Sequence, residues 1–344
     1  MENPERIGSV EELENLLSRP TEGLIEMMKR IDGDVMILGI AGKMGVTMGR
    51  QALNAVRAAG VSKKVIGVSR FSKQEEREKL ESRGIETIAC DLLDRESVEK
   101  LPQVKNIVFL AGRKFGTGGS EAQTWAMNIL APSYVGAHFR DSRIVAFSTG
   151  CVYPLVGIAT CGCTEEVVPE PVGEYSQSCL GRERIFQYCS QKYGTKVLLF
   201  RLNYAIDLRY GVLHDIARSV WEERPVDNTV GYFNVIWQGD ANSNALRALE
   251  LCDSPAAVLN VTGPEIASVE QTALQFGRLF GKSVAFKGVP GSACYLNNSA
   301  RMCRTFGYPN VSLERMIRWQ ADWIRSGGIS IGKPTHFEVN NGKF

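Results

Sequence analysis

Short runs of consecutive apolar residues alternate with amphipathic stretches along most of the chain. The first run fills the positions between Asp34 and Gly39, and similar runs recur at 64–69, 85–91, 106–111, 143–148 and 196–201. The spacing of apolar residues between these runs predicts helices at about 45–59, 74–83, 95–101, 119–139 and 174–193. A strand that is apolar throughout is typical of a parallel sheet buried on both faces. The alternation therefore predicts an α/β fold, a doubly wound parallel sheet with helices on both sides.

The pattern changes at both ends of this region. Residues 1–33 are predicted to form an N-terminal helical extension, because Ser9 and Glu12 have the spacing of a capping box ahead of apolar residues. Beyond Arg201 the alternation loosens, with helices expected at 211–224, 239–251, 268–280, 299–307 and 312–326, and strands at 232–237 and 257–262. We predict a sheet domain over 34–202 to which 232–262 return, and a smaller C-terminal lobe formed by 203–231 and 263–344.

Composition mainly excludes classes of function. The 344 residues include 40 basic and 38 acidic side chains, and the resulting net charge of +2 gives no reason to expect nucleic acid or an anionic membrane as partner. Nine cysteines are an odd number for a disulfide framework, and reduced thiols suggest the cytoplasm. The three histidines are far apart and have no metal-binding spacing, so no metal site is expected. A zinc ion could be bound by four cysteines, namely Cys151, Cys161, Cys163 and Cys179, if the fold brings them together. The alternative is that these are thiols without such a function.

Three glycines mark the point where the first strand meets the first helix. They are Gly39, Gly42 and Gly45, with Lys43 and Met44 between the last two. Glycine permits a tight turn and close approach of the backbone to a pyrophosphate, which the helix N-terminus attracts through its free N–H groups. The strand-turn-helix context predicts a dinucleotide phosphate site, although the glycines could serve a tight turn alone.

The end of the second strand bears on the choice of cofactor. Dinucleotide-binding sheets usually carry a carboxylate there for the adenosine ribose, but this chain has Ser69 and Arg70. A hydroxyl and a guanidinium match a ribose 2′-phosphate better, so we expect NADP rather than NAD. The alternative is that Arg70 stacks on adenine, which would suit either cofactor.

With these glycines the chain resembles the extended short-chain dehydrogenases of the nucleotide-sugar epimerase/dehydratase family, which have the Rossmann fold. Further motifs match in order: Asp91-Leu92, Leu110-Ala111-Gly112, Asn128, Ser148-Thr149-Gly-Cys151-Val-Tyr-Pro154 and Asn260-Val-Thr-Gly263. The resemblance covers roughly residues 34–326. It implies that Asp91, Leu92, Ala111, Gly112 and Asn128 bind the cofactor, that the substrate is a small sugar-like molecule, and that the helices at 119–139 and 174–193 pair in a homodimer.

The resemblance also implies a catalytic pair, with one departure. Thr149 and Tyr175 would hold the oxygen of a secondary alcohol or ketone, and Tyr175 would also contact the cofactor and move the proton. Tyrosine has a pKa of about 10 and needs a nearby cation to act as a base, which the family supplies as a lysine four residues on. Here that position is Cys179. Either Arg182, Arg113 or Lys114 replaces the lysine, or the chain binds nucleotide without turnover.

Cys151 and His214 form a second candidate pair. Family members that epimerise carbons beside a transient ketone carry a cysteine before an aliphatic-Tyr-Pro sequence, as here, and one type adds a histidine at a place comparable to His214. A thiolate and an imidazolium could exchange a carbon-bound proton on opposite faces. The alternatives are a small buried hydrophobe for Cys151 and a surface or substrate-phosphate contact for His214.

The sequence therefore predicts an NAD(P)-dependent oxidoreductase or epimerase acting on a secondary alcohol or ketone of a sugar, nucleotide-sugar or polyol. The competing prediction is a non-catalytic NAD(P)-binding sensor or regulatory protein derived from the same fold.

Overall fold

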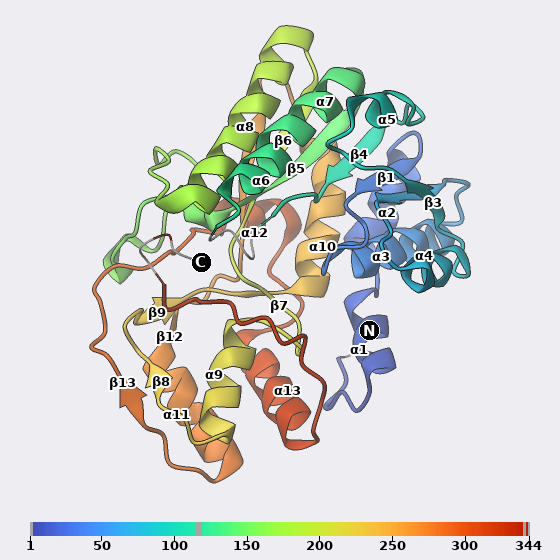
Figure 1. Cartoon of the computed structure of the whole chain (residues 1–344). Coiled ribbons are helices and arrows are strands. Elements are labelled where there is room, and N and C mark those ends of the chain that lie inside the picture. The colour runs from blue at the N-terminus through green and yellow to red at the C-terminus, as the bar shows by residue number, and fades with distance from the viewer. Residues whose placement is uncertain (1–2, 114–118, 340–341, 343–344) are drawn as a thin grey trace.

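A seven-stranded parallel sheet forms the centre of the larger lobe in the computed structural model, which describes residues 3–113, 119–339 and 342. The strand order is β11-β6-β5-β4-β1-β2-β3 (Figure 1). The strands are β1 (Val35–Leu38), β2 (Val65–Ser69), β3 (Glu86–Ala89), β4 (Asn106–Phe109), β5 (Arg143–Thr149), β6 (Lys196–Leu202) and β11 (Ala257–Val261). The predicted doubly wound Rossmann fold is confirmed, because the order reverses beside β1 as in dinucleotide-binding sheets.

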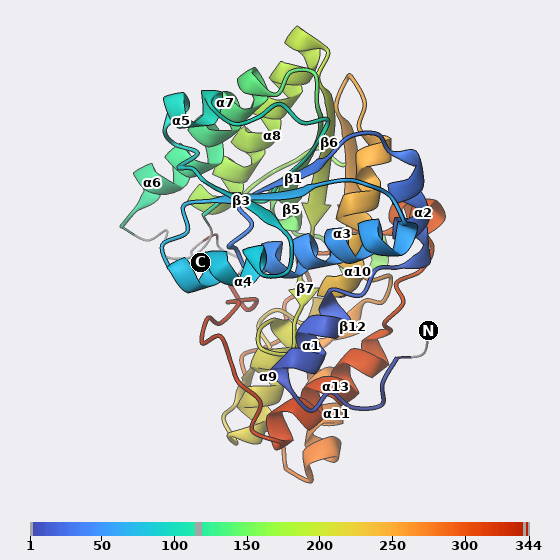
Figure 2. The same ribbon diagram turned by 90° about the vertical axis from the view of Figure 1, so that its right-hand side faces the viewer.

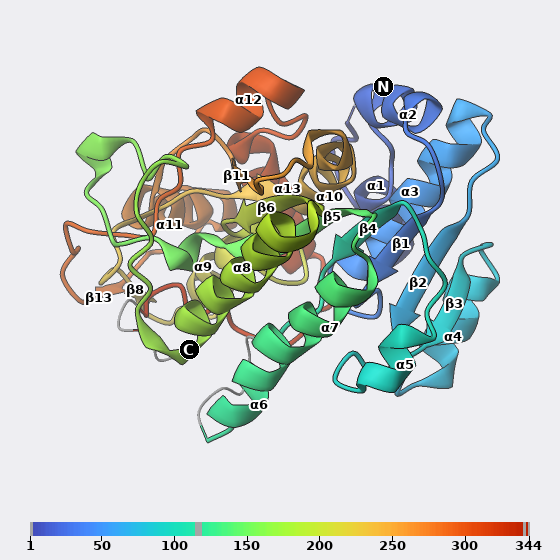
Figure 3. The same ribbon diagram turned by 90° about the horizontal axis from the view of Figure 1, so that it is seen from above.

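Helices cover both faces of this sheet, as Figure 3 shows from above. One face packs against α3 (Gly45–Ala59), α4 (Gln74–Glu81), α10 (Gln238–Arg247) and α12 (Ala300–Phe306), and the other against α5 (Arg95–Glu99), α7 (Ala131–His138) and α8 (Gly173–Tyr193). In β1, Val35 and Ile37 enter the first core while Met36 and Leu38 enter the second. Burial on both sides explains why the strands are apolar at every position.

The predicted helix over 119–139 is divided into three pieces. They are α6 (Glu121–Trp125), a π-helical segment (Ala126–Leu130) and α7. The π segment contains Asn128, which is fully buried. Such one-turn widenings are frequent at functional sites, and here the register places the asparagine against the cofactor side of the sheet.

The N-terminal extension joins the two lobes. The first helix, α1 (Val10–Leu17), begins at Ser9, whose side chain accepts from the Glu12 N–H as the capping box predicts. This helix packs with the smaller lobe, whereas α2 (Glu22–Arg30) packs on α3 and α10 of the larger lobe (Figure 2). Glu14 on α1 pairs with Arg50 of the larger lobe and with Arg209 of the smaller lobe.

The smaller lobe is built on three helices with short strand pairs. The helices are α9 (Val212–Trp221), α11 (Val269–Phe280) and α13 (Leu313–Arg325), and the paired strands are β7 (Ala205–Ile206) with β10 (Ile236–Trp237), β9 (Tyr232–Phe233) with β12 (Ala267–Ser268), and β8 (Val226–Asp227) with β13 (Phe286–Lys287). The strand expected over 232–237 is thus two pieces. Phe233 and Trp237 pack in the smaller lobe's core, whereas Ile236 packs in the core of the larger lobe, so the return to the sheet begins at β10 and continues through α10.

The chain continues beyond α13 without further helix or strand in the described residues. This segment leaves the smaller lobe and crosses the front of the molecule toward the first turn of α8 (Figure 1). Gly342 reaches Gly173, because a Cβ built on Gly173 would lie 2.3 Å from the Gly342 carbonyl oxygen. None of the described helices is long and apolar enough to cross a membrane.

Candidate active site

A cavity of about 480 Å³ lies at the carboxyl ends of β1, β4, β5 and β6, facing the smaller lobe. This edge is where ligands bind in open parallel sheets. Its lining combines residues from five regions: the glycine turn, the loop after β4, the end of β5, the first turns of α8, and the smaller lobe with the C-terminal segment. The cavity therefore brings together most of the positions expected to bind cofactor and substrate.

The glycine turn is shaped for close backbone approach. Gly39 has φ +94°, and a Cβ there would lie 2.8 Å from the Ala111 backbone nitrogen. At Gly45 a Cβ would lie 2.3 Å from the Ile40 carbonyl oxygen, so the start of α3 packs directly on the turn. Lys43 and Met44 line the same wall. The residues present therefore fit a dinucleotide, whose pyrophosphate would sit at the N-terminus of α3.

Further residues expected to bind the cofactor lie at the carboxyl ends of β2, β3 and β4. Ser69 ends β2, and Arg70 follows it with an exposed side chain. Asp91 uses one carboxylate oxygen to accept from the Leu93 N–H, which fixes the loop after β3, and Leu92 is buried in the core. Gly112 follows Ala111 and lies against Arg182 and Asn128, which leaves no room for a side chain.

Thr149 and Tyr175 lie in the same cavity with Cys151. Thr149 ends β5, and its hydroxyl accepts from the Cys151 N–H at 3.2 Å. Tyr175 comes from the first turn of α8. Burial, followed by the neighbouring thiols of Cys179 and Cys151, raises the pKa of Tyr175 well above its ordinary value, and Arg182 opposes this shift. Tyr175 is therefore a neutral phenol near neutral pH.

Cys179 occupies the place of the lysine that the family resemblance led us to expect. Its side chain is fully buried, and burial raises the pKa of its thiol. The sulfur accepts a hydrogen bond from the Tyr175 hydroxyl. A neutral thiol thus contacts the phenol where the family has a cation, and it cannot lower the pKa of Tyr175 as a lysine would.

Arg182 brings a positive charge to this site from the next turn of α8. The side chain is 6% exposed and lines the cavity, donating to the Phe147 carbonyl at 2.8 Å and to the Asn128 side-chain oxygen. No carboxylate of the described chain lies within ion-pair distance of it. Because only neutral acceptors hold this buried guanidinium, its positive charge is not compensated and can stabilise a negative charge in the cavity. Arg113 instead reaches Gln123 and Ser120, and Lys114 lies outside the described residues.

Asn128 connects the loop after β4 to α8. Its side-chain oxygen accepts from the Arg113 N–H and from Arg182, and its nitrogen donates to the Ser178 hydroxyl at 2.8 Å. The predicted cofactor residue thus acts on the cavity by fixing Arg182 and the backbone around Gly112.

A buried polar network holds the catalytic strand in place, and sequence reasoning did not find it. Glu183 accepts from Ser148 at 2.5 Å and pairs bidentately with Arg201 on β6. Arg201 donates to the Tyr153 hydroxyl at 2.7 Å, which donates to Asn260 on β11. The glutamate beside Arg182 is therefore already neutralised by another arginine. The apolar pattern of these elements gave no signal for such a network.

His214 and Cys151 are not brought together. Cys151 lies beside Tyr175, Tyr204 and Tyr295, whose pKa values it raises. The ring of His214 lines a separate surface pocket, and its nitrogens bond to the Leu208 carbonyl at 2.9 Å and the Ser330 hydroxyl at 3.0 Å. Burial lowers the pKa of His214, so the ring is neutral in the folded protein. This geometry gives the expected proton-exchange pair no support.

The substrate side of the cavity comes mainly from the loop after β6, the turn before α9, the start of α10 and the C-terminal segment. Asn203, Tyr204, Tyr210, Gln238, Lys333 and Thr335 line it. Two buried polar groups lie nearby without a partner among the described residues, the Tyr295 hydroxyl and the Asn297 side-chain amide. Four cations line the cavity, Lys43, Arg113, Arg182 and Lys333, and its described lining contains no carboxylate. Such a lining favours an anionic ligand.

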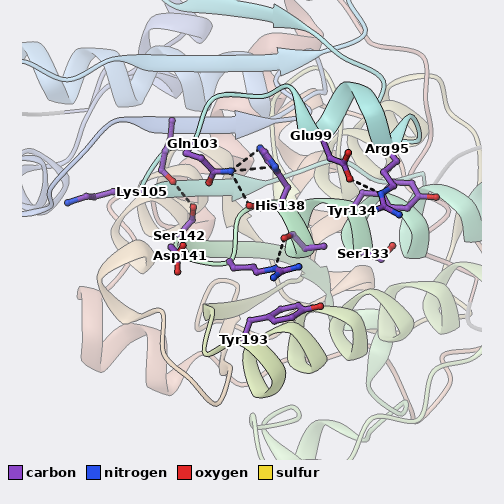
Figure 4. A pocket seen from close by; sticks show the side chains of 13 residues that line it. Arg95, Glu99, Gln103, Lys105, Ser133, Tyr134, His138, Asp141, Ser142 and Tyr193 are labelled. Atoms are coloured by element: carbon purple, nitrogen blue, oxygen red, sulfur yellow. Dashed lines mark hydrogen bonds and ion pairs between the residues drawn. The ribbon is translucent and has the colours of Figure 1, made fainter.

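A larger pocket of about 970 Å³ lies elsewhere, by the amino ends of β4 and β5 (Figure 4). Its side chains are largely engaged with one another: Gln103 bonds His138, and Arg140 lies over the Tyr193 ring at 4.2 Å. It shares no residue with the cavity of the catalytic candidates. Within the described residues, no group of histidines, cysteines or carboxylates is arranged to hold a metal ion.

Known proteins share the fold of this chain, and a family model matches half of its sequence. Residues 35–206 match the model of the NAD dependent epimerase/dehydratase family. Among curated proteins the sequence has no match.

Solved structures show the same fold at low sequence identity. The UDP-glucose 4-epimerase of Thermotoga maritima, solved with UDP-glucose, superposes with a TM-score of 0.68 at 17% identity, over 86% of this chain and 99% of that one. The dTDP-glucose 4,6-dehydratase of Bacillus anthracis, solved with NAD, gives 0.71 at 18% identity, over 86% and 97%. The UDP-glucuronic acid 4-epimerase of Bacillus cereus with NAD gives 0.66 at 17% identity, over 85% and 98%.

Proposed function

This chain belongs to the NAD dependent epimerase/dehydratase family, and from that membership we propose that it is a nicotinamide-dependent oxidoreductase or epimerase acting on a secondary alcohol or ketone of a sugar or nucleotide-sugar. The observation that carries the proposal is the shared cavity: the glycine turn, Thr149, Tyr175 and the buried cation Arg182 all line it. The sugar-nucleotide enzymes of the same fold make that substrate class the first to test.

The bound nicotinamide would supply or accept the hydride, and this chain's own residues would handle the proton. Thr149, which lines the cavity, would hold the substrate oxygen. Tyr175, neutral because its pKa is raised, donates its proton to that oxygen as a carbonyl is reduced. Arg182 stabilises the phenolate that remains but, since it stays protonated, does not relay the proton. In the oxidative direction Tyr175 would first have to lose its own proton, which its raised pKa makes less favourable near neutral pH.

Gly39, Gly42, Lys43, Met44 and Gly45 would bind the cofactor's pyrophosphate. Ser69, Arg70, Asp91 and Leu92 would bind its adenosine half, with Ala111, Gly112, Asn128 and Tyr175 toward the nicotinamide. We propose NADP as the preferred cofactor. Support comes from Arg70, whose exposed guanidinium follows β2 and takes part in no hydrogen bond or ion pair with the described residues.

Tyr175→Phe tests the proposal directly, because it removes the proton donor and keeps the ring. Purified protein would be assayed with NADPH and NADH against UDP-4-ketosugars and, in the reverse direction, UDP-glucose, UDP-glucuronate and dTDP-glucose. We expect turnover that falls by at least about a hundredfold in the variant, with unchanged NADPH affinity. Tyr308→Phe, at an exposed position outside the cavity and outside α6 and α8, is the matched control.

A non-catalytic NADP-binding sensor is the second candidate, favoured by the neutral Cys179 thiol beside Tyr175. NADPH binding without turnover of any sugar nucleotide, in wild type and Tyr175→Phe alike, would select this function and reject the first.

Assembly and location are proposed on separate grounds. We propose a homodimer formed through α6 and α8, because Trp125 and Tyr188 are 36% and 51% exposed there, with Leu130 at 45% on the π-helical segment between α6 and α7. Light scattering of the purified protein would measure the mass. The nine cysteines are all free, which supports a reducing compartment such as the cytoplasm.

A further inference from the structure

The segment after α13 forms part of the wall of the candidate active site. We call residues 327–339 the C-terminal strap. It crosses between the lobes in Figure 1, and two of its residues, Lys333 and Thr335, line the same cavity as Thr149 and Tyr175. No other described segment closes that side of the cavity from beyond residue 300.

The strap is fixed to α9 and the loop before it by specific bonds. The Ser330 hydroxyl meets His214 at 3.0 Å, and the Ile331 N–H donates to the Arg209 carbonyl at 3.0 Å. Further along, the backbone N–H and hydroxyl of Thr335 both donate to Asp215, at 2.8 and 2.5 Å. The His214 ring and its neighbour thus anchor the strap.

An apolar anchor follows these bonds. Phe337 is 6% exposed and packs in the smaller lobe's core, beside Tyr204 and Tyr295. Lys333 is therefore held between two fixed points, Ile331 and Thr335, although its own side chain is exposed at the cavity mouth. Because both ends are fixed, the position of its charge is determined by the fold.

The charge of Lys333 is available to a ligand. It takes part in no ion pair or hydrogen bond with the described residues, and none of the described residues that line the cavity carries a carboxylate. The other cations have different contacts: Lys43 of the glycine turn lies over the Tyr210 ring at 3.3 Å, and Arg182 is bonded to the Phe147 carbonyl and the Asn128 side chain. Lys333 lines the cavity from the C-terminal strap, whereas the glycine turn lines it from the start of α3.

We propose that the C-terminal strap completes the substrate site and that Lys333 is a specificity-determining residue that binds a phosphate group of the substrate. The proposal rests on the proposed function, since it assigns the cofactor's phosphates to the glycine turn. A lysine is a compact charge that suits phosphate oxygens and discriminates little by direction. Substrates with a phosphate would bind, and neutral sugars would bind weakly.

The test measures binding of UDP to full-length protein saturated with NADPH, by titration calorimetry. Lys333→Met removes the charge and keeps most of the aliphatic side chain, and Lys333→Arg restores the charge. Lys287→Met is the control, because Lys287 lines the surface pocket of His214 together with Lys333 but does not line the cavity. We expect Lys333→Met to weaken UDP binding about tenfold, with Lys333→Arg within about twofold of wild type.

NADPH affinity should be the same in all variants. Unchanged UDP affinity in Lys333→Met, or an equal loss in Lys287→Met, would overturn the proposal, as would competition between UDP and NADPH for one site. Failure of wild type to bind NADPH would refute the proposed function instead. In that case the UDP titration without cofactor still decides whether Lys333 binds phosphate.

Discussion

At the scale of single residues, the site depends on a substitution that changes the acid–base chemistry. Cys179 removes the cation that would lower the pKa of Tyr175, and burial raises that pKa further. Arg182 supplies a positive charge from two helical turns beyond Tyr175 on α8, whereas the family's lysine would lie one turn beyond it. The family motif of four residues does not include Arg182, and its orientation depends on its bonds to Phe147 and Asn128.

Arg182→Met tests whether this buried cation supports turnover. The variant should lose at least about tenfold in kcat, because the phenolate left by proton transfer is no longer stabilised. It should also lose stability of about 1–3 kcal/mol, since two buried acceptors lose their donor. Steady-state kinetics and thermal unfolding measure the two effects. Arg184→Met on the exposed face of α8 should change neither, and wild-type kcat in Arg182→Met would exclude the role.

Arg70→Ala tests the choice of cofactor. We expect the affinity for NADPH to fall about tenfold while that for NADH changes less than about twofold, because only NADPH carries the 2′-phosphate. Fluorescence titration of both cofactors on wild type and variant gives the comparison. Equal losses for the two cofactors would show that the guanidinium stacks on adenine instead.

At the scale of elements, helices and strands of the larger lobe follow the apolar pattern closely, whereas short elements do not. β8, β12 and β13 have two residues each and no periodicity to detect. The π-helical segment around Asn128 could not be predicted from the sequence either, because it depends on the contacts of Asn128 with Arg113, Ser178 and Arg182.

The strap gives a prediction at this scale. Thr335→Val removes the hydroxyl bond to Asp215 and keeps the shape of the side chain. The KM for a phosphorylated substrate should rise about threefold to tenfold while kcat and NADPH affinity stay within about twofold, because the strap positions Lys333 without touching the reacting atoms. A matched fall in kcat, or no change at all in KM, would argue against this positioning role. Thr305→Val on exposed α12 is the control.

The anchor at His214 predicts a dependence on pH. Burial lowers the pKa of His214 below its ordinary 6.5, with Asp215, Arg218 and Asp207 as the charged groups that face it. The folded state thus binds fewer protons than the unfolded state. The stability from the neutral ring is present above about pH 6.5 and is lost as the pH falls through the folded pKa.

His214→Gln should therefore lose less stability than wild type between about pH 7.5 and 5, although it is less stable at the higher pH. Asp215, whose pKa burial raises, changes stability in the opposite sense in both proteins, so the difference between them reports the ring together with its interaction with Asp215. Thermal unfolding and protease cleavage within the strap measure the outcome. Parallel pH profiles of the two proteins would refute it.

At the scale of the whole molecule, one buried network links the strands that carry the site. Glu183 on α8 ties Ser148 on β5 to Arg201 on β6, and Tyr153 extends the contact to β11. Glu183→Gln should lower the free energy of unfolding by about 3–5 kcal/mol, because it leaves the Arg201 charge buried without its partner. Chemical denaturation measures this. Glu99→Gln, in the exposed pair with Arg95, should change it by less than about 0.5 kcal/mol.

The sequence by itself determined the central sheet, the glycine turn and the positions of Thr149 and Tyr175. The sheet and the glycine turn are local features: an apolar run buried on both faces, and a strand that meets a helix at glycines. Thr149 and Tyr175 came from the family resemblance, through motifs at the end of a strand and the start of a helix.

Only the tertiary structure decided which side chains share the cavity. It separated His214 from Cys151, brought Lys333 to the cavity mouth, and turned Arg182 toward Tyr175. These outcomes depend on contacts between residues far apart in the chain, such as those of His214 with Ser330 and of Asp215 with Thr335. Periodicity along the chain carries no information on such contacts, because it reports which face of an element is buried and not what it is buried against.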